Sequence, residues 1–151
     1  MAKTPAEITR SPWVQAFLQA PHMARLATCN PVTLQPHVVP VWYEWDGESI
    51  WVSSFRSTRK VRELLANPLA SLVIDIDERG SAAVGVIFEG PVEIITDPQT
   101  GIARGTRIYE RYLGVDGAQA EEPQSWLHDA EHLLLRLVPI RAYAWGAPEG
   151  A

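Results

Sequence analysis

A tight turn flanked by alternating side chains is the feature of this sequence that most constrains its fold. The dipeptide Asp46-Gly47 is typical of the two-residue turn that closes a β-hairpin. The flanking β-branched or aromatic residues are Val39, Val41, Tyr43 and Trp45 before the turn and Ile50 and Val52 after it. Because successive side chains of a strand point to opposite faces, the pattern predicts an antiparallel pair with one buried face.

Other segments have the composition of strands and are separated by turns. The hairpin supplies two strands, His37–Trp45 and the strand after the turn. The other predicted strands are Met23–Thr28, Ala70–Asp75, Ala82–Ile95 with a bulge expected at Gly90-Pro91, and His132–Trp145 with an interruption near Pro139. Six or so strands joined mostly by hairpin-like turns predict an antiparallel sheet that closes on itself. The expected fold class is mainly β (α+β), a small six-stranded antiparallel barrel.

Three short helices are expected around this barrel. They are a helix that begins at Ser11-Pro12 and ends before Pro21, one within Ser57–Asn67, and one over Pro98–Leu113. Gly114–Pro123 is expected to be a long loop. Because no internal repeat or linker divides the chain, we expect residues 1–151 to form a single domain.

Charge and composition restrict the partners of the chain. An apolar content of 46% is enough to bury a core, and 13 Lys+Arg against 18 Asp+Glu give a net charge of -5. This balance provides no electrostatic footprint for nucleic acid or for an anionic membrane. The single cysteine, Cys29, and the lack of an apolar leader or spanning segment indicate a cytoplasmic protein. An anionic ligand therefore needs a local cluster of cations.

Such a cluster occurs where a predicted strand runs into a predicted helix, at Ser57-Thr58-Arg59-Lys60. The free amides of a first helical turn carry the positive end of the helix dipole, and these side chains add donors and charge. A phosphate monoester is the ligand expected there. In the alternative interpretation, Ser57 only caps the helix and the basic side chains are solvated. Spacing alone does not decide between the two.

Other polar clusters give weaker indications. His128 and His132 have a spacing that on a helix places two imidazoles together, but a third ligand is not evident, so we expect a solvated helix end and no metal. Glu44, Asp46 and Glu48 flank the hairpin tip and are interpreted as exposed loop carboxylates. None of them shows the partner that an acid/base pair needs.

Most of the chain resembles a known superfamily in the order and separation of its motifs. The segments that carry the resemblance are Ala24–Thr28, Pro36–Tyr43, the Asp46-Gly47 hairpin, Lys60–Pro68 leading to a strand, Gly85–Ile95 and Trp145–Pro148. This arrangement resembles the split-barrel flavin-binding superfamily of pyridoxamine-phosphate-oxidase-like proteins and deazaflavin-dependent reductases. The resemblance implies a six-stranded antiparallel split β-barrel (Greek key) with a few short flanking helices. Glu63 departs from it, because relatives often carry Asn there.

The resemblance also implies a set of cofactor-binding residues. Thr58 and Lys60, helped by Ser57 and Arg59, would hold the cofactor phosphate. Those assigned to the ribityl chain and the ring are Ser53, Ser54, His37, Pro40 and Val41. In such folds a two-fold partner completes the pocket, so Trp145 of a second subunit could supply an aromatic wall. Packing of Trp145 in the core of the homodimer is the alternative.

The function implied by the resemblance is that of an oxidoreductase that uses FMN, or alternatively the deazaflavin coenzyme F-420, on a small-molecule substrate. Gly85–Gly90 and Tyr109–Tyr112 look like the deazaflavin branch, and Arg56 and Arg62 are available for a polyglutamate tail. FMN needs only the phosphate contacts. A cofactor-binding protein without catalysis and an empty barrel that acts as a structural dimer are the alternatives.

Overall fold

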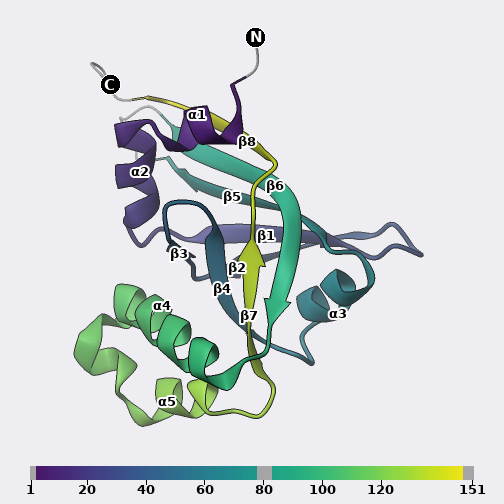
Figure 1. The fold of residues 1–151 in the computed structure, drawn as a ribbon, viewed down its shortest axis with the longest axis vertical. Helices are drawn as coiled ribbons and strands as arrows, with labels where there is room; N and C mark the ends of the chain where they lie inside the picture. Colours follow the sequence, from purple (N-terminus) through teal and green to yellow (C-terminus); the bar gives the residue numbers. More distant parts are fainter. Residues whose placement is uncertain (1–2, 78–82, 148–151) are drawn as a thin grey trace.

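The computed structural model describes residues 3–77 and 83–147 (Figure 1). Its strands are β1 (Ala24–Cys29), β2 (Pro36–Val41), β3 (Glu44–Trp45), β4 (Ile50–Phe55), β5 (Leu69–Ile76), β6 (Val84–Ile95), β7 (His132–Leu137) and β8 (Arg141–Trp145). Its helices are α1 (Pro5–Thr9), α2 (Pro12–Gln19), α3 (Arg59–Ala66), α4 (Pro98–Ala118) and α5 (Glu121–Leu127).

The strands form an antiparallel sheet that curls into a split β-barrel. Their order is β2-β1-β5-β6-β7-β4-β3, and β8 pairs with the N-terminal part of β6, from Gly85 to Glu89. Strand β6 changes partner along its length, because Pro91 lies opposite Leu69 of β5 whereas Val92 lies opposite Leu137 of β7. The predicted irregularity at Gly90-Pro91 is thus the point where β6 passes from one half of the sheet to the other. The predicted fold class is confirmed.

The strand count is eight rather than six, because two predicted strands are each divided. In His37–Trp45 the division falls at Tyr43, whose backbone is withdrawn from the ladder. Its N–H donates to the Tyr112 hydroxyl at 3.3 Å, and its carbonyl accepts from Arg111 Nε at 2.9 Å. The second division, near Pro139 as predicted, separates β7 from β8.

All three predicted helices are confirmed: α2 after Ser11, α3 before Pro68, and α4, which begins at Pro98 and is helical up to the interruption at Gly114. Helix α1 was not predicted, although Thr4 and Glu7 form a capping box with Pro5 in the first turn. The predicted loop Gly114–Pro123 is wrong. Helix α4 is interrupted at Gly114 but continues to Ala118, and α5 begins at Glu121.

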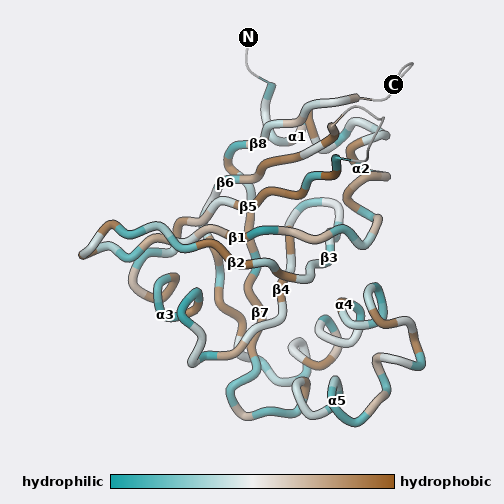
Figure 2. Tube along the Cα trace, turned by 180° about the vertical axis from the view of Figure 1, so that it is seen from behind, coloured by the Kyte–Doolittle hydropathy of each residue, from teal (hydrophilic) through white to brown (hydrophobic). Residues whose placement is uncertain are grey.

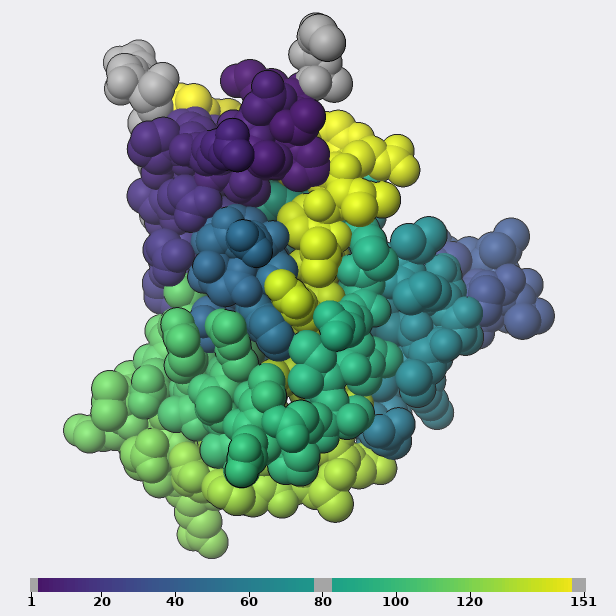
Figure 3. All heavy atoms as spheres, viewed as in Figure 1, coloured from purple at the N-terminus to yellow at the C-terminus, as the bar shows by residue number. Residues whose placement is uncertain are grey.

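The hydrophobic core fills the interior of the curled sheet, where β5 and β6 carry the apolar runs seen in Figure 2. A second, smaller cluster lies between α4, α5 and the sheet, and consists of Trp51, Ile108, Tyr109, Ala118, Leu127 and Leu134. Helices α1 and α2 lie at one end of the molecule, with α1 against β8, and α4 and α5 cover the other end (Figure 3). In the described part of the chain, no helix is long and apolar enough to cross a membrane.

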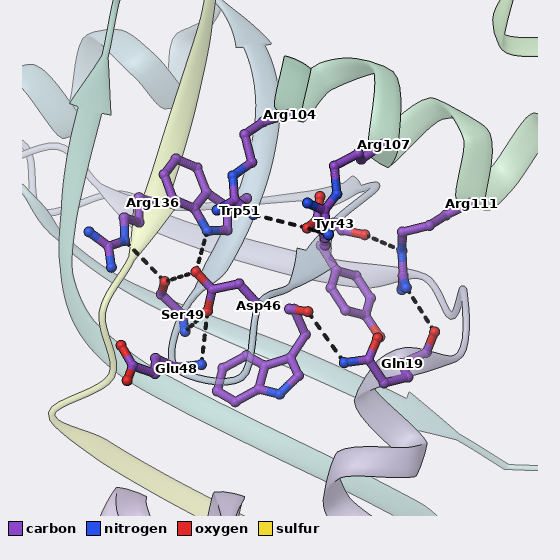
Figure 4. A network of polar contacts seen from close by, with 12 residues as sticks. Gln19, Tyr43, Asp46, Glu48, Ser49, Trp51, Arg104, Arg107, Arg111 and Arg136 are labelled. Carbon is purple, nitrogen blue, oxygen red and sulfur yellow. Dashed lines mark hydrogen bonds and ion pairs between the residues drawn. The ribbon is translucent and has the colours of Figure 1, made fainter. Parts of the chain in front are cut away.

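The predicted hairpin is confirmed, with Glu44 opposite Trp51 and Trp45 opposite Ile50, but its loop consists of Asp46–Ser49 rather than the dipeptide Asp46-Gly47 alone. The Asp46 carboxylate ties the turn together by accepting bonds of 2.7 to 2.8 Å from the Glu48 and Ser49 amides and from Trp51 Nε1 (Figure 4). The expectation of an exposed carboxylate is wrong for Glu44, which is 4% exposed. The reason is tertiary: α4 covers this side of the hairpin.

Candidate functional site

A cleft of about 420 Å³ opens between the sheet and the helices α3, α4 and α5. Its lining residues are Met23, Pro40, Val41, Trp42, Ser53, Phe55, Lys60, Ile108, Tyr109 and Trp126. Four of them are predicted site residues, namely Pro40, Val41, Ser53 and Lys60. Strands β2 and β4 and the start of α3 follow one another in the sequence, whereas Ile108, Tyr109 and Trp126 come from α4 and α5, which are distant in sequence and meet them in the folded chain.

Aromatic rings form a fixed wall on one side of this cleft. Trp42 stacks on Tyr112 with ring centroids 5.0 Å apart and an interplanar angle of 6°. Tyr109 meets Trp42 and Trp126 edge to face, at 6.1 and 5.5 Å. Because each ring is held by another, the wall is preformed for a flat, apolar ligand.

The Lys60 ammonium is the charged group of the cleft. It is half-buried at the first turn of α3, and burial lowers its pKa from the ordinary value of 10.5. Among residues 3–77 and 83–147, no carboxylate forms an ion pair with it. A cation that loses hydration without gaining a protein partner favours an anion bound at this position.

The other residues of the predicted phosphate site are engaged within the protein. Ser57 Oγ donates to Glu131 Oε2 at 2.6 Å, and Arg59 Nε lies 3.2 Å from Glu63 Oε2. The Thr58 hydroxyl donates to the Phe55 carbonyl at 2.9 Å rather than capping the helix. Since α3 has no side-chain cap, its first amides are left for another acceptor.

Glu63, the departure from the family pattern, has a structural role here. Its carboxylate is 5% exposed and accepts from the buried Thr28 hydroxyl at 3.2 Å as well as from Arg59. Glu63 therefore joins α3 to β1, and it pairs with Arg59, which was predicted to bind the phosphate.

The two serines at the end of β4 point to opposite faces, as alternation requires. Ser53 lines the cleft, and its Oγ lies 2.8 Å from both the Tyr109 hydroxyl and His132 Nε2. Ser54 is 3% exposed, and its Oγ lies 3.3 Å from Thr58 Oγ1 inside the molecule. Only Ser53 of this pair can touch a ligand in the cleft.

Two further predicted residues, on other strands, lie outside the cleft of this chain. His37 lies on β2 opposite Thr28, and Trp145 lies on β8 in a separate groove of about 730 Å³ beside α1 and α2. His128 follows α5 whereas His132 begins β7, so the two imidazoles do not share a helix. In the described ranges, no group of three possible metal ligands occurs.

Comparison with known proteins agrees with this geometry. The model of the family described as pyridoxamine 5'-phosphate oxidase matches residues 11–145. The chain belongs to the pyridoxamine 5'-phosphate oxidase family. No curated protein matches it significantly.

Solved structures give the same result for this family member. A conserved hypothetical protein from Mycobacterium tuberculosis is 27% identical with a TM-score of 0.74, over 97% of this chain and 86% of that one. A protein named F420 reductase is 26% identical with a TM-score of 0.68, over 85% of this chain and 94% of that one. The heme storage protein HutZ from Vibrio cholerae, 21% identical with a TM-score of 0.70 over 88% and 92% of the two chains, shares the fold.

Several residues of this family member's cleft were not predicted. They are Met23, Trp42, Phe55, Ile108, Tyr109 and Trp126, with His132 behind them. Trp42 directly follows the predicted residue Val41, so its position next to a predicted site residue could have identified it. Tyr109 and Trp126 come from helices whose docking on the sheet no local pattern reveals.

Proposed function

We propose that this chain is an oxidoreductase that binds a flavin-type cofactor in the cleft. The observation that carries the proposal is Lys60, a half-buried cation without a carboxylate partner in the described residues, placed at the edge of an aromatic cleft. The cofactor phosphate binds at Lys60 and the uncapped amides of α3, and the ring lies against Pro40, Val41 and the aromatic wall. The likeness to an F420 reductase supports this assignment.

When bound, such a cofactor supplies hydride transfer, and the protein supplies placement and surroundings. Lys60 fixes the phosphate end, so the ring has one orientation in the cleft. The apolar side chains of Met23, Val41 and Ile108 exclude water from the reacting region. Ser53 and Tyr109 are the polar groups that face the ring or the substrate.

The identity of the cofactor depends on the cations around the phosphate site. Arg56 and Arg62 are exposed and form no ion pair within residues 3–77 and 83–147, so both are available to a polyglutamate tail. FMN would use Lys60 and the helix amides alone. We propose FMN, with coenzyme F-420 as the alternative that these two arginines support.

Titration of the purified protein with FMN and with coenzyme F-420, followed by cofactor fluorescence, tests the proposal. We expect Lys60→Ala to weaken binding of the preferred cofactor by about 100-fold, because loss of a charge-assisted contact costs about 3 kcal/mol. Lys3→Ala removes the same charge from a distant groove and is the matched control. Equal affinities of the two variants would overturn the site, and no binding of either cofactor would overturn the function.

Catalysis and carriage are separated by turnover. An oxidoreductase reoxidises its reduced cofactor faster when a small unsaturated substrate is added, whereas a carrier shows no dependence on substrate. Stopped-flow absorbance of the reduced, loaded protein measures this rate with and without a panel of enones and nitroaromatics.

We also propose that two copies of the chain form the functional unit. Large apolar side chains are exposed on β2 and on the β8 face, with Val38 63%, Ile140 57% and Tyr143 48% accessible. Exposed apolar surface of this kind favours an interface. Sedimentation velocity is expected to give a dimer, and a monomer at micromolar concentration would contradict this.

A further inference from the structure

Three side chains from three separate elements form a hydrogen-bonded row that leads into the cleft. Tyr109 of α4 and Ser53 of β4 line the cleft, whereas His132 of β7 lies behind them. Ser53 Oγ is 2.8 Å from the Tyr109 hydroxyl and 2.8 Å from His132 Nε2. Each of these hydrogen bonds can run in either direction, which is the property that proton transfer along a row requires.

The His132 imidazole occupies a space that α4 leaves open. Gly101 and Gly105 lie one turn apart on the helix face that packs against it. A Cβ atom at Gly101 would lie 3.3 Å from His132 Nδ1, and one at Gly105 would lie 3.4 Å from Cε1. Phe55 closes the other side, with its ring edge-on at 6.1 Å. The ring is therefore fixed in the orientation that directs Nε2 to Ser53.

The opposite nitrogen of His132, Nδ1, is not completely buried. Nδ1 has no hydrogen-bond partner within the described ranges. The fully buried side-chain polar atom that lacks a partner there is Glu44 Oε2, so the unpartnered Nδ1 is not itself fully buried. Nδ1 is therefore not sealed from solvent. Burial lowers the pKa of His132, with Asp129 raising it and His128 lowering it further, so the ring is mostly neutral near pH 7. A neutral imidazole can take a proton at one nitrogen and release one from the other.

We propose that His132, Ser53 and Tyr109 form a proton relay from solvent to the substrate in the cleft, with Tyr109 as the group that protonates the substrate. This inference rests on the proposed function. Tyr109 is the catalytic acid, Ser53 transmits the proton, and His132 is a positioning residue that also replenishes it. The substrate class is a small electrophilic alkene or related acceptor that takes up one hydride and one proton.

The step balances with a reduced flavin-type cofactor as the hydride donor. The electrophilic carbon of an enone receives the hydride and forms a C–H bond, while the π electrons move toward the carbonyl oxygen. The Tyr109 O–H bond breaks, and its proton goes to the resulting enolate. Tyr109 regains a proton from Ser53, Ser53 from His132 Nε2–H, and His132 binds a solvent proton at Nδ1. The product carries two more electrons and two more hydrogens than the substrate.

Coupling along the row can be measured without cofactor. In the protein labelled with ¹⁵N-histidine, the side-chain shifts of His132 give its titration midpoint by NMR. We expect Ser53→Ala and Tyr109→Phe each to move this midpoint by about 0.3 pH units or more, since hydrogen bonds shift the pKa of the group they reach. Ser125→Ala, an exposed serine bonded to the Glu122 carbonyl, is the control and leaves it unchanged. An unchanged midpoint in Tyr109→Phe overturns the relay.

Proton delivery is measured in the loaded, reduced protein with two acceptors. 2-Cyclohexen-1-one needs a proton for its reduction, whereas ferricyanide accepts electrons alone. We expect the ratio of the enone rate to the ferricyanide rate to fall about 100-fold in Tyr109→Phe and about tenfold in Ser53→Ala and His132→Gln. Equal slowing with both acceptors, or none with the enone, overturns the relay. Absence of cofactor binding refutes the proposed function instead, and the NMR titration still decides the coupling.

Discussion

At the residue scale, a buried carboxylate decides how α4 is held against the hairpin. Glu44 Oε1 lies 3.0 Å from Arg104 Nη1 and 3.0 Å from Arg107 Nη2, and Arg104 also covers the Trp51 ring at 4.4 Å. Figure 4 shows Arg104 and Arg107 reaching from α4 toward this point. The second oxygen, Oε2, is buried without a partner in the described chain, so the two arginines are the groups that hold this carboxylate.

We expect Glu44→Gln to lower the free energy of unfolding by about 2 kcal/mol. The amide keeps the shape but removes the negative charge that faces two guanidinium groups, and the exposure of Arg107 keeps the cost below that of a fully buried pair. Urea denaturation measures it, with Glu48→Gln at the exposed hairpin tip as the control, expected within about 0.5 kcal/mol of wild type. Coinciding midpoints of the two variants would contradict this role.

The Asp46 carboxylate makes the stability of the hairpin depend on pH. Burial opposes its charged form, but hydrogen bonds from Trp51, Glu48 and Ser49 outweigh burial and lower its pKa from 3.8 to about 2. Because the folded pKa is depressed, the stabilisation is present above pH 3.8 and is lost as the pH falls to about 2. We expect Asp46→Asn to reduce the dependence of the melting temperature on pH between these two values, as measured by circular dichroism. Parallel curves for the two proteins would refute this.

At the element scale, one glycine determines the path of the chain between α4 and α5. Gly114 has a φ of 77° and interrupts α4, and a Cβ there would meet nothing within 4 Å. A substitution therefore changes backbone conformation alone. We expect Gly114→Ala and Gly114→Asn each to cost about 1 to 3 kcal/mol, because φ 77° with ψ 167° is a backbone conformation essentially restricted to glycine. Thermal unfolding of both variants measures the loss, and a stability equal to that of wild type in either variant would show that this conformation is not required.

At the scale of the whole molecule, Arg111 connects parts of the chain that are distant in sequence. From α4 it donates to the carbonyls of Tyr43 at 2.9 Å, Gln19 at 2.7 Å and Ala20 at 3.1 Å (Figure 4). Gln19 is the last residue of α2 and Ala20 is its C-cap, so Arg111 supplies donors to carbonyls at the end of this helix. Its planar fork therefore fixes α2, the barrel and α4 relative to one another.

We expect Arg111→Lys to lower the free energy of unfolding by about 2 kcal/mol, because an ammonium cannot reach all these carbonyls and leaves some unpaired. The same variant should increase amide hydrogen exchange at the end of α2. Exchange mass spectrometry together with urea denaturation measures both effects. If the amides at the end of α2 were as well protected from exchange in Arg111→Lys as in wild type, the positive charge of residue 111 rather than its planar guanidinium would be responsible.

Local patterns were enough to predict much of this protein. Alternation around Asp46-Gly47 identified the hairpin, and the basic helix start included Lys60, which lines the cleft. Alternation should also have distinguished Ser53 from Ser54, since neighbours on a strand face opposite ways. The loop prediction for Gly114–Pro123 failed because a positive-φ glycine can redirect a helix as well as end it.

The sequence by itself determined the strands, the turn at Asp46-Gly47 and the cation at the start of α3, because these depend on side-chain period and on residues close in the chain. The tertiary structure alone decided which charges remain available. Glu131 and Glu63 reach Ser57 and Arg59 through contacts that folding creates, so Lys60 alone of the four faces the cleft. Likewise, the row of Tyr109, Ser53 and His132 exists only because α4 packs on the sheet, since no local spacing joins residues so far apart.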